Sequence, residues 1–117
     1  MTTTREVFDR HVSHQLDRDL DAILTDYAPD AIVVGPVGIG SGHDHIRASY
    51  EQVLPLLGAL DLTLVQVQGE VVYVNFRARS GGRDDLVGTD TFVIRDGLIR
   101  VHTFYATTEG PTADDRS

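Results

Sequence analysis

The spacing of apolar residues changes once along this chain, and that change limits the folds available to it. As far as about residue 57, apolar side chains recur at intervals of three and four residues, whereas from Leu60 onwards they alternate with polar ones. Helices followed by a run of hairpin strands are typical of an α+β fold rather than a doubly wound parallel sheet. Because 117 residues suit one domain, we expect a single domain over residues 1–108.

The first of three predicted helices opens with a capping signal. Thr3 and Glu6 have the spacing of a capping box, in which each side chain accepts a hydrogen bond from the other residue's amide. The apolar stripe that follows consists of Phe8, Val12 and Leu16. His11 borders this stripe, where a histidine is more often an edge residue with satisfied hydrogen bonds than a catalyst.

Two further helices are expected before the long strands. Asp19 can cap a second helix, which carries Tyr27 on its apolar stripe and ends at Pro29. A short β-branched run at 31–34 follows, and the glycine-rich segment 37–42 must then turn. The third helix begins near residue 43, and its apolar stripe is Ile46, Tyr50, Val53, Leu54 and Leu57.

Four long strands are expected in the second half, at residues 60–67, 71–79, 86–94 and 98–106. Apolar residues change phase within the first of them, which indicates a bulge near Leu64. Turns are expected at 80–82 and at Asp96-Gly97. Three helices on one face of such a curved, mainly antiparallel sheet would form a cone that encloses a ligand pocket.

Composition argues against several classes of protein. The net charge of −8 disfavours binding to nucleic acid or to an anionic membrane, since both require a basic surface. Without cysteine the chain cannot form disulfides or thiolate metal sites. No segment approaches the ~20 apolar residues of a membrane span, and the N-terminus lacks the apolar core of a signal peptide. We therefore expect a cytoplasmic protein with a disordered acidic tail at 109–117.

Six short segments carry a resemblance to a known superfamily. They are residues 19–23, 27–31, 36–38, 41–47, 88–92 and 95–99. Their order resembles that in the superfamily of ketosteroid isomerase, SnoaL-like polyketide cyclases and nuclear transport factor 2. The resemblance implies the cone-shaped fold, a pocket and a homodimer, and the alternating apolar residues on the outer face of the sheet also suggest a dimer. Because this fold carries many unrelated functions, it does not by itself imply a reaction.

The resemblance carries over to four individual positions. The aspartate that shuttles the proton in the isomerases corresponds to Gly35, so that base is missing. Their oxyanion-donating tyrosine corresponds to His11. Their second, protonated aspartate corresponds to Asp90, and the pocket-facing position of the final strand corresponds to His102. The resemblance therefore implies a pocket with ionisable side chains but not steroid isomerisation.

Asp90 also stands out from the residues alone. It interrupts the strand at 86–94, which otherwise has the composition of a buried strand. A carboxylate in such a strand has to be paired, hydrogen-bonded or protonated, unless it lies on the solvent face.

The position of His102 relative to Asp90 depends on the turn between their strands. A three-residue loop would pair Ile94 with Leu98 and place Asp90 opposite His102. A two-residue turn would instead place Asp90 opposite Thr103 and send His102 to the other surface of the sheet. The resemblance favours the first arrangement.

Further residues are expected to line the pocket and contact a substrate: Tyr50, Tyr27, Phe92, Phe104, Val33, Gly35 and Asn75. Core packing alone explains each aromatic residue at least as well. The inward face of strand 71–79 stays open, because either Tyr73 and Asn75 or their neighbours can face the pocket. His43 and His45 are two potential metal ligands at a helix start, which do not make a closed site, so we expect no metal and no cofactor.

Three functions are compatible with these residues. We expect a cofactor-independent isomerase, cyclase or dehydratase acting on a small hydrophobic oxygenated substrate, with Asp90 and His102 as acid and base and His11 as donor or orienter. The missing base at Gly35 favours instead a module that binds a small apolar ligand or a protein without chemistry. A limonene-type epoxide hydrolase would need an Asp-Arg-Asp relay, of which Asp90 supplies only one member.

Overall fold

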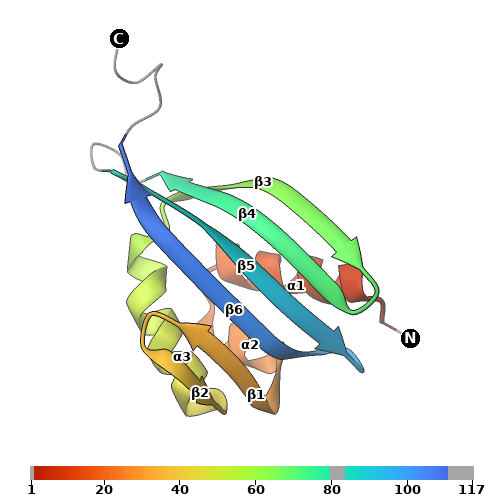
Figure 1. Cartoon of the computed structure of the whole chain (residues 1–117). Coiled ribbons are helices and arrows are strands. Elements are labelled where there is room, and N and C mark those ends of the chain that lie inside the picture. Colours follow the sequence, from red (N-terminus) through yellow and green to blue (C-terminus); the bar gives the residue numbers. More distant parts are fainter. Residues whose placement is uncertain (1, 80–83, 111–117) are drawn as a thin grey trace.

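The computed structural model describes residues 2–79 and 84–110, which fold as three helices against one six-stranded sheet (Figure 1). The helices are α1 (Thr4–Leu16), α2 (Leu20–Thr25) and α3 (His43–Val53), and a 3₁₀ turn, η1 (Leu54–Leu56), follows α3. The strands are β1 (Tyr27–Gly35), β2 (Gly38–Ser41), β3 (Ala59–Gln68), β4 (Val71–Arg79), β5 (Asp85–Arg95) and β6 (Leu98–Glu109). None of the helices in this part of the chain has the length and apolar composition needed to cross a membrane.

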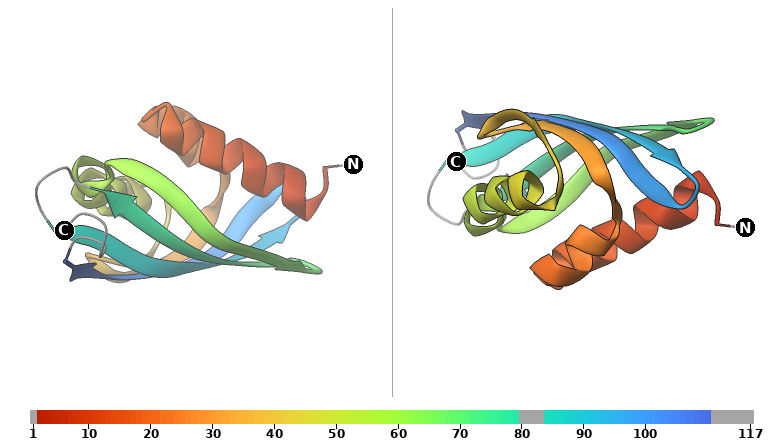
Figure 2. Two further views of the ribbon diagram at one scale, coloured as in Figure 1. Left: turned by 90° about the horizontal axis from the view of Figure 1, so that it is seen from above. Right: turned by 90° about the horizontal axis from the view of Figure 1, so that it is seen from below.

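The sheet is mostly antiparallel and places the helices on one side. Its strand order is β2-β1-β6-β5-β4-β3. β1 runs parallel to β6, and every other neighbouring pair is antiparallel. The sheet curves, and both views in Figure 2 show α1 and α3 on its concave side. The predicted α+β fold, with three helices against a curved, mainly antiparallel sheet, is therefore confirmed.

Helix α1 begins where the capping signal predicts but buries a different face. The Thr3 hydroxyl accepts from the Glu6 amide and the Glu6 carboxylate accepts from the Thr3 amide, as a capping box requires. The buried residues of the helix are Val7, Phe8 and His11, whereas Leu16 is 60% exposed. Residues three and four apart share a helix face, so His11 lies inside the buried stripe rather than at its edge.

The second helix ends earlier than predicted, and Tyr27 belongs to a strand. Asp26 is the C-terminal cap of α2, and β1 starts at the next residue. Tyr27 pairs with Ile99 of β6, and this tertiary pairing overrides the helical spacing of its apolar neighbours. Pro29 consequently lies in β1, where the pairing with β6 is irregular, rather than at a helix end. The glycine-rich segment 37–42 does turn, but it also forms β2 against β1.

The burial pattern of β4 decides which of its residues face the helices. The strand has the bounds that the alternation predicts, and its buried residues are Val72, Val74, Phe76 and Ala78. Tyr73 and Asn75 alternate with them and therefore face the opposite surface. The predicted bulge near Leu64 is confirmed, because the pairing of β3 with β4 shifts register between Leu62 and Leu64.

Strand β6 is longer than predicted and includes the first residue of the expected tail. It continues to Glu109, which pairs with Asp85 in the ladder with β5. The Glu109 carboxylate also accepts a hydrogen bond from Arg77 at 2.7 Å. Residue 109 is therefore ordered in the sheet. The rest of the predicted tail, from 111 to 117, and the predicted turn at 80–82 lie outside the described residues.

Candidate functional site

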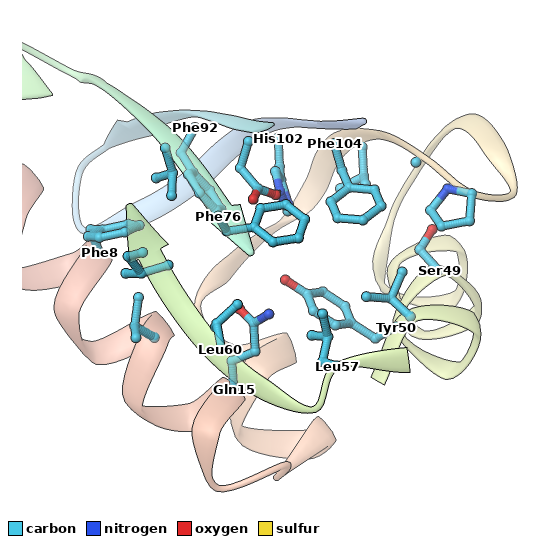
Figure 3. Close-up of a pocket in the computed structure, with 18 residues that line it drawn as sticks. Phe8, Gln15, Ser49, Tyr50, Leu57, Leu60, Phe76, Phe92, His102 and Phe104 are labelled. Carbon is cyan, nitrogen blue, oxygen red and sulfur yellow. The ribbon is translucent and has the colours of Figure 1, made fainter. Parts of the chain in front are cut away.

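A cavity opens between the concave face of the sheet and helices α1 and α3, and its walls are mostly apolar. The empty space inside it, open mouth included, is about 630 Å³. Its lining includes Phe8, Val33, Gly35, Tyr50, Phe76, Asp90, Phe92, His102 and Phe104. Figure 3 shows the His102 ring on the sheet side of this cavity and the Tyr50 side chain projecting into it from α3.

The position of His102 is set by a bulge between β5 and β6. Neither of the two predicted registers contained this bulge. The turn at Asp96-Gly97 has two residues with positive φ angles of 54° and 77°, so the three-residue loop that the resemblance favoured is wrong. The register then shifts next to Ile94, and Phe92 pairs with His102. Without this shift the two-residue turn would send His102 to the outer surface. With it, His102 shares the pocket face with Asp90 and reaches it diagonally across the ladder.

Asp90 and His102 form a hydrogen-bonded pair in the pocket wall. Oδ1 of Asp90 lies 2.6 Å from Nε2 of His102, and the two side chains are 16% and 7% exposed. The Phe92 ring stacks on the imidazole with the ring centroids 4.1 Å apart. Among the described residues, Oδ1 is the only Asp90 oxygen with a hydrogen-bond partner. The pair is therefore rigidly held, and Oδ2 remains open to a ligand.

Two tyrosines continue the polar chain away from the dyad. The hydroxyl oxygen of Tyr27 lies 2.7 Å from Nδ1 of His102 and 2.7 Å from the hydroxyl oxygen of Tyr50. The Tyr50 oxygen lies 3.0 Å from Nε2 of His11. Since Tyr27 belongs to β1 and Tyr50 to α3, the chain crosses from the sheet to the helices. Burial raises the pKa of each phenol above its usual value, so both stay protonated.

The chain ends at a second buried carboxylate, Asp26. Its Oδ2 lies 3.1 Å from Nδ1 of His11 and 2.9 Å from Nδ1 of His14, and its Oδ1 accepts from Nε of Arg10 at 2.9 Å. Burial acts to raise the pKa of Asp26, but the hydrogen bonds from its three partners outweigh burial and lower that pKa. Burial also lowers the pKa of His11 by more than its bond to Asp26 raises it. These hydrogen bonds therefore favour the carboxylate form of Asp26.

Most of the predicted site residues line the cavity: Asp90, His102, Tyr50, Phe92, Phe104, Val33 and Gly35. His11 and Tyr27 lie behind this wall and reach the dyad only through hydrogen bonds. Asn75 lies on the opposite face of β4, because Val74 and Phe76 occupy the pocket face. The predicted substrate contact of Asn75 is corrected accordingly, and that side of the pocket is apolar.

Asp26 and the part of the cavity wall that α1 forms were not predicted as site residues from the sequence. Asp26 gives no local signal, because its three partners all lie on α1 and approach it only after the helix packs against the start of β1. Phe8, Val12 and Gln15 line the cavity from α1. The helical spacing of Phe8 and Val12 was a signal for these two residues, and Gln15 lies at the edge of the same predicted stripe.

Three other basic side chains, His43, His45 and Arg77, have structural partners. Nε2 of His43 and of His45 bonds backbone carbonyl oxygens of β1 at 3.1 and 3.0 Å, so both half-buried rings tie α3 to the sheet rather than lying on the surface. Arg77 donates to Asp85 at 2.6 Å and to Glu109 at 2.7 Å. Within the described chain no arginine lines the cavity, so the Asp-Arg-Asp relay of an epoxide hydrolase has no arginine there.

Comparison with known proteins identifies the family. The model of the SnoaL-like domain family matches residues 8–102, and the chain therefore belongs to that family. The resemblance to the SnoaL-like and nuclear transport factor 2-like superfamily is confirmed. No curated protein sequence shows a significant match to the chain.

Solved structures share the fold at low sequence identity. A steroid delta-isomerase from Pseudomonas aeruginosa is 21% identical with a TM-score of 0.76, covering 94% of this chain and 81% of that one. A nuclear transport factor 2-like protein of unknown function from Burkholderia xenovorans is 19% identical with a TM-score of 0.75, covering 97% and 91%. TerC, co-crystallised with polyporic acid, is 24% identical with a TM-score of 0.68, covering 89% and 91%. At these identities the likeness shows the fold alone.

Proposed function

We propose that the protein is a cofactor-independent acid–base enzyme of SnoaL-like type that acts on a small, hydrophobic, oxygenated substrate. The observation that carries the proposal is the Asp90–His102 pair, whose atoms lie 2.6 Å apart in a mostly apolar pocket. A carboxylate with one open oxygen in such a wall can exchange a proton with a bound substrate while the imidazole holds it in place. Isomerases, cyclases and dehydratases share this step.

The proposed chemistry is proton transfer next to a carbonyl group. Oδ2 of Asp90 takes a proton from the adjacent carbon, and the electron pair of that C–H bond moves into an enolate. Return of the proton at another position completes an isomerisation, and loss of a leaving group completes a dehydration. His102 fixes the direction of Oδ2 by bonding Oδ1. His11 does not line the cavity, so in this proposal it positions other groups and does not touch the substrate.

The substrate class follows from the walls of the cavity. Aromatic and aliphatic side chains surround the dyad, which favours a ligand with a flat or ring-shaped apolar body and few oxygen atoms. A steroid isomerase and a protein crystallised with polyporic acid have the same fold, which supports a ring-shaped ligand.

Deuterium exchange tests the proposal without knowledge of the natural substrate. Cyclic ketones, enones and 1,3-diketones are incubated with the protein in D₂O, and the loss of the acidic C–H signal is followed by NMR. Asp90→Asn and His102→Gln should slow the exchange by about 100-fold or more. Asp21→Asn is the matched control, because Asp21 is 87% exposed on α2, and it should leave the rate unchanged. Equal rates in folded dyad variants and the unaltered protein would refute the assignment.

A binding module without chemistry is the second candidate, and Gly35 favours it. Gly35 lines the cavity without a side chain, so the end of β1 supplies no second carboxylate opposite Asp90. In this case a ligand that co-purifies should appear unchanged in native mass spectrometry. The Asp90→Asn variant should then retain it. Conversion of the ligand by the unaltered protein, but not by the variant, decides for the enzyme.

We also propose that the protein forms a homodimer through the outer face of the sheet. Val71, Tyr73 and Tyr105 are exposed there by 39%, 37% and 69%, and burying apolar side chains is favourable. Sedimentation at micromolar concentration should show a dimer, and a monomer under these conditions would reject the proposal.

A further inference from the structure

A continuous chain of hydrogen-bonded side chains joins the pocket to the protein surface, and the proposed chemistry uses only its first two members, Asp90 and His102. The chain runs through Asp90, His102, Tyr27, Tyr50, His11, Asp26 and His14. We propose that it is a proton relay, which carries a proton between Asp90 in the pocket and His14 at the surface. The inference rests on the proposed function in one respect, namely that Asp90 exchanges protons with a ligand.

The chain is unbroken at every step between the two carboxylates. From Asp90 to Asp26 the successive donor–acceptor distances are 2.6, 2.7, 2.7, 3.0 and 3.1 Å. The four residues between the carboxylates are all buried, so water does not compete for these bonds. Each imidazole bonds its two neighbours through its two different nitrogens. Each phenol bonds both of its neighbours through its one hydroxyl group. Every group can therefore receive a proton on one side and release one on the other.

The hydrogen-bonded chain can carry a proton because it has more hydrogen bonds than its neutral groups have protons. Five hydrogen bonds join the two carboxylates, and each bond requires one proton. With both carboxylates ionised, two neutral imidazoles and two phenols supply four protons. A fully hydrogen-bonded chain therefore holds one additional proton. With neutral imidazoles, this proton resides on Asp90 or on Asp26.

The relay step moves each proton across its own hydrogen bond. When the additional proton is on Asp90, every group donates to the next one in the direction of Asp26. After each proton has crossed, Asp90 is a carboxylate and Asp26 is a carboxylic acid. Each imidazole has lost a proton from one nitrogen and gained one on the other, and each phenol has exchanged its proton. All four intervening groups are neutral before and after, so no phenolate is needed.

Asp26 connects the relay to solvent through His14. His11 and His14 approach the same oxygen, Oδ2, at 3.1 and 2.9 Å, so a proton received from His11 can pass to Nδ1 of His14 when His14 is the neutral tautomer that carries its proton on Nε2. The His14 side chain is 27% exposed, whereas that of Asp26 is fully buried. Arg10 donates to the other oxygen, Oδ1, at 2.9 Å and favours the carboxylate form after the proton has left.

Nitrogen NMR of the histidine rings tests the relay without turnover. In protein labelled with ¹⁵N-histidine, the chemical shift of each ring nitrogen reports whether it carries a proton. Asp90→Asn removes the titratable carboxylate at the pocket end. Because the direction of every bond depends on its neighbour, the His11 ring should shift toward a different tautomer. Tyr27→Phe removes one bond of the chain at nearly constant volume, and in that background Asp90→Asn should leave His11 unchanged.

Control variants distinguish an effect of the hydrogen-bonded chain from a general effect on the structure. Asp21→Asn, outside the chain, should preserve the response of His11 to Asp90→Asn. If Tyr27→Phe does not fold, Tyr50→Phe breaks the adjoining bonds and takes its place. A His11 ring that ignores Asp90→Asn in the otherwise unaltered protein overturns the relay. A response that survives loss of the tyrosine hydroxyl overturns it too, because the effect would then travel through structure rather than through the bonds.

Deuterium exchange separates failure of the relay from failure of the proposed function. Exchange that requires Asp90, without coupling to His11, rejects the relay and leaves the enzyme. Coupling to His11 without exchange of any probe rejects the enzyme and leaves the relay. If both are present, Tyr27→Phe should lower the exchange rate by roughly tenfold, and by less than Asp90→Asn does.

Discussion

Asp26 and Asp90 are both withdrawn from bulk solvent, yet their surroundings differ in a way that separates two roles. Asp26 is fully buried and has three basic partners, all of them on α1. Asp90 keeps 16% of its side chain exposed and borders the cavity, and His102 is its single partner among the residues that the structure describes. A carboxylate whose two oxygens are both occupied holds its neighbours in place, whereas one with an open oxygen can act on a ligand.

This difference predicts that Asp26 contributes mainly to stability and Asp90 mainly to activity. Asp26 joins α1 to the start of β1, and its removal leaves Nδ1 of the buried His11 without its partner. Asp90 is positioned by the ladder between β5 and β6 and by stacking around His102. Loss of Asp26 should therefore reduce the free energy of unfolding, whereas loss of Asp90 should reduce activity.

The largest effect on stability is expected from Asp26→Ala. The substitution removes one partner of a buried, hydrogen-bonded charge cluster, which typically costs about 3–5 kcal/mol. Urea unfolding followed by circular dichroism measures this loss. Asp21→Ala is the matched control, because Asp21 is 87% exposed and pairs only with Arg47, and it should cost less than about 1 kcal/mol. Equal losses in the two variants would contradict the role assigned to Asp26.

Acid should destabilise the fold in two stages around the same cluster. The pKa of His11 is lower in the folded protein than its ordinary 6.5, and that of Asp26 is lower than its ordinary 3.8. In both cases the unfolded chain binds the proton first as the pH falls, so stability decreases. The stabilisation that these two groups contribute is fully present above about pH 6.5. Below that pH it declines by up to ~1.4 kcal/mol per pH unit for each proton bound.

Melting temperatures between pH 8 and pH 3 check this dependence. The Asp26→Asn variant should lose the lower stage, because its amide does not titrate. A melting temperature that rises as the pH falls from 7 to 5 would reverse the expected sign and reject the contribution of His11.

Asp90→Asn should change stability far less than Asp26→Ala. The asparagine Oδ1 can still accept the hydrogen bond from His102, and the other atom of the group faces the cavity, so a loss below about 1 kcal/mol is expected. Urea unfolding under the same conditions gives the comparison. A loss as large as that of Asp26→Ala would mean that Asp90 is chiefly structural and would weaken the proposed function.

The smallest effect is expected from Arg10→Gln. The Arg10 side chain is 41% exposed, and its bond to Asp26 is one of three. The loss should be about 0.5 kcal/mol, and it should shrink in 1 M salt because screening already weakens an exposed charge. Urea unfolding at two salt concentrations measures both. A salt-independent loss of several kcal/mol would show that Asp26 depends on Arg10 rather than on the two histidines.

Signals that act between sequence neighbours predicted their elements well. The Thr3–Glu6 capping box starts α1 as expected, and the alternation of 71–79 gives the bounds of β4. The phase change around Leu64 marks the bulge in β3. In each case the residues that decide the structure lie within a few positions of one another, so the sequence contains the whole cause.

The sequence predicted the structure poorly where a residue's position depends on partners far away in the chain. The apolar spacing placed Tyr27 on a helix, but pairing with Ile99 draws it into β1. The choice between two turn lengths for the last hairpin omitted the register shift next to Ile94 that returns His102 to the pocket. Unlike the bulge in β3, this shift depends on how β5 and β6 fit each other, and no residue at the turn marks it.

The sequence by itself determined the order of the elements, the α+β class and the presence of Asp90 and His102 on adjacent strands, because periodicity and turn chemistry are local. Only the tertiary structure decided that His11 is buried, that Asn75 faces away from the cavity and that Asp26 gathers its partners from α1. The reason is physical. A side chain's face, burial and hydrogen-bond partners depend on the packing of helix against sheet, which joins residues far apart in the chain.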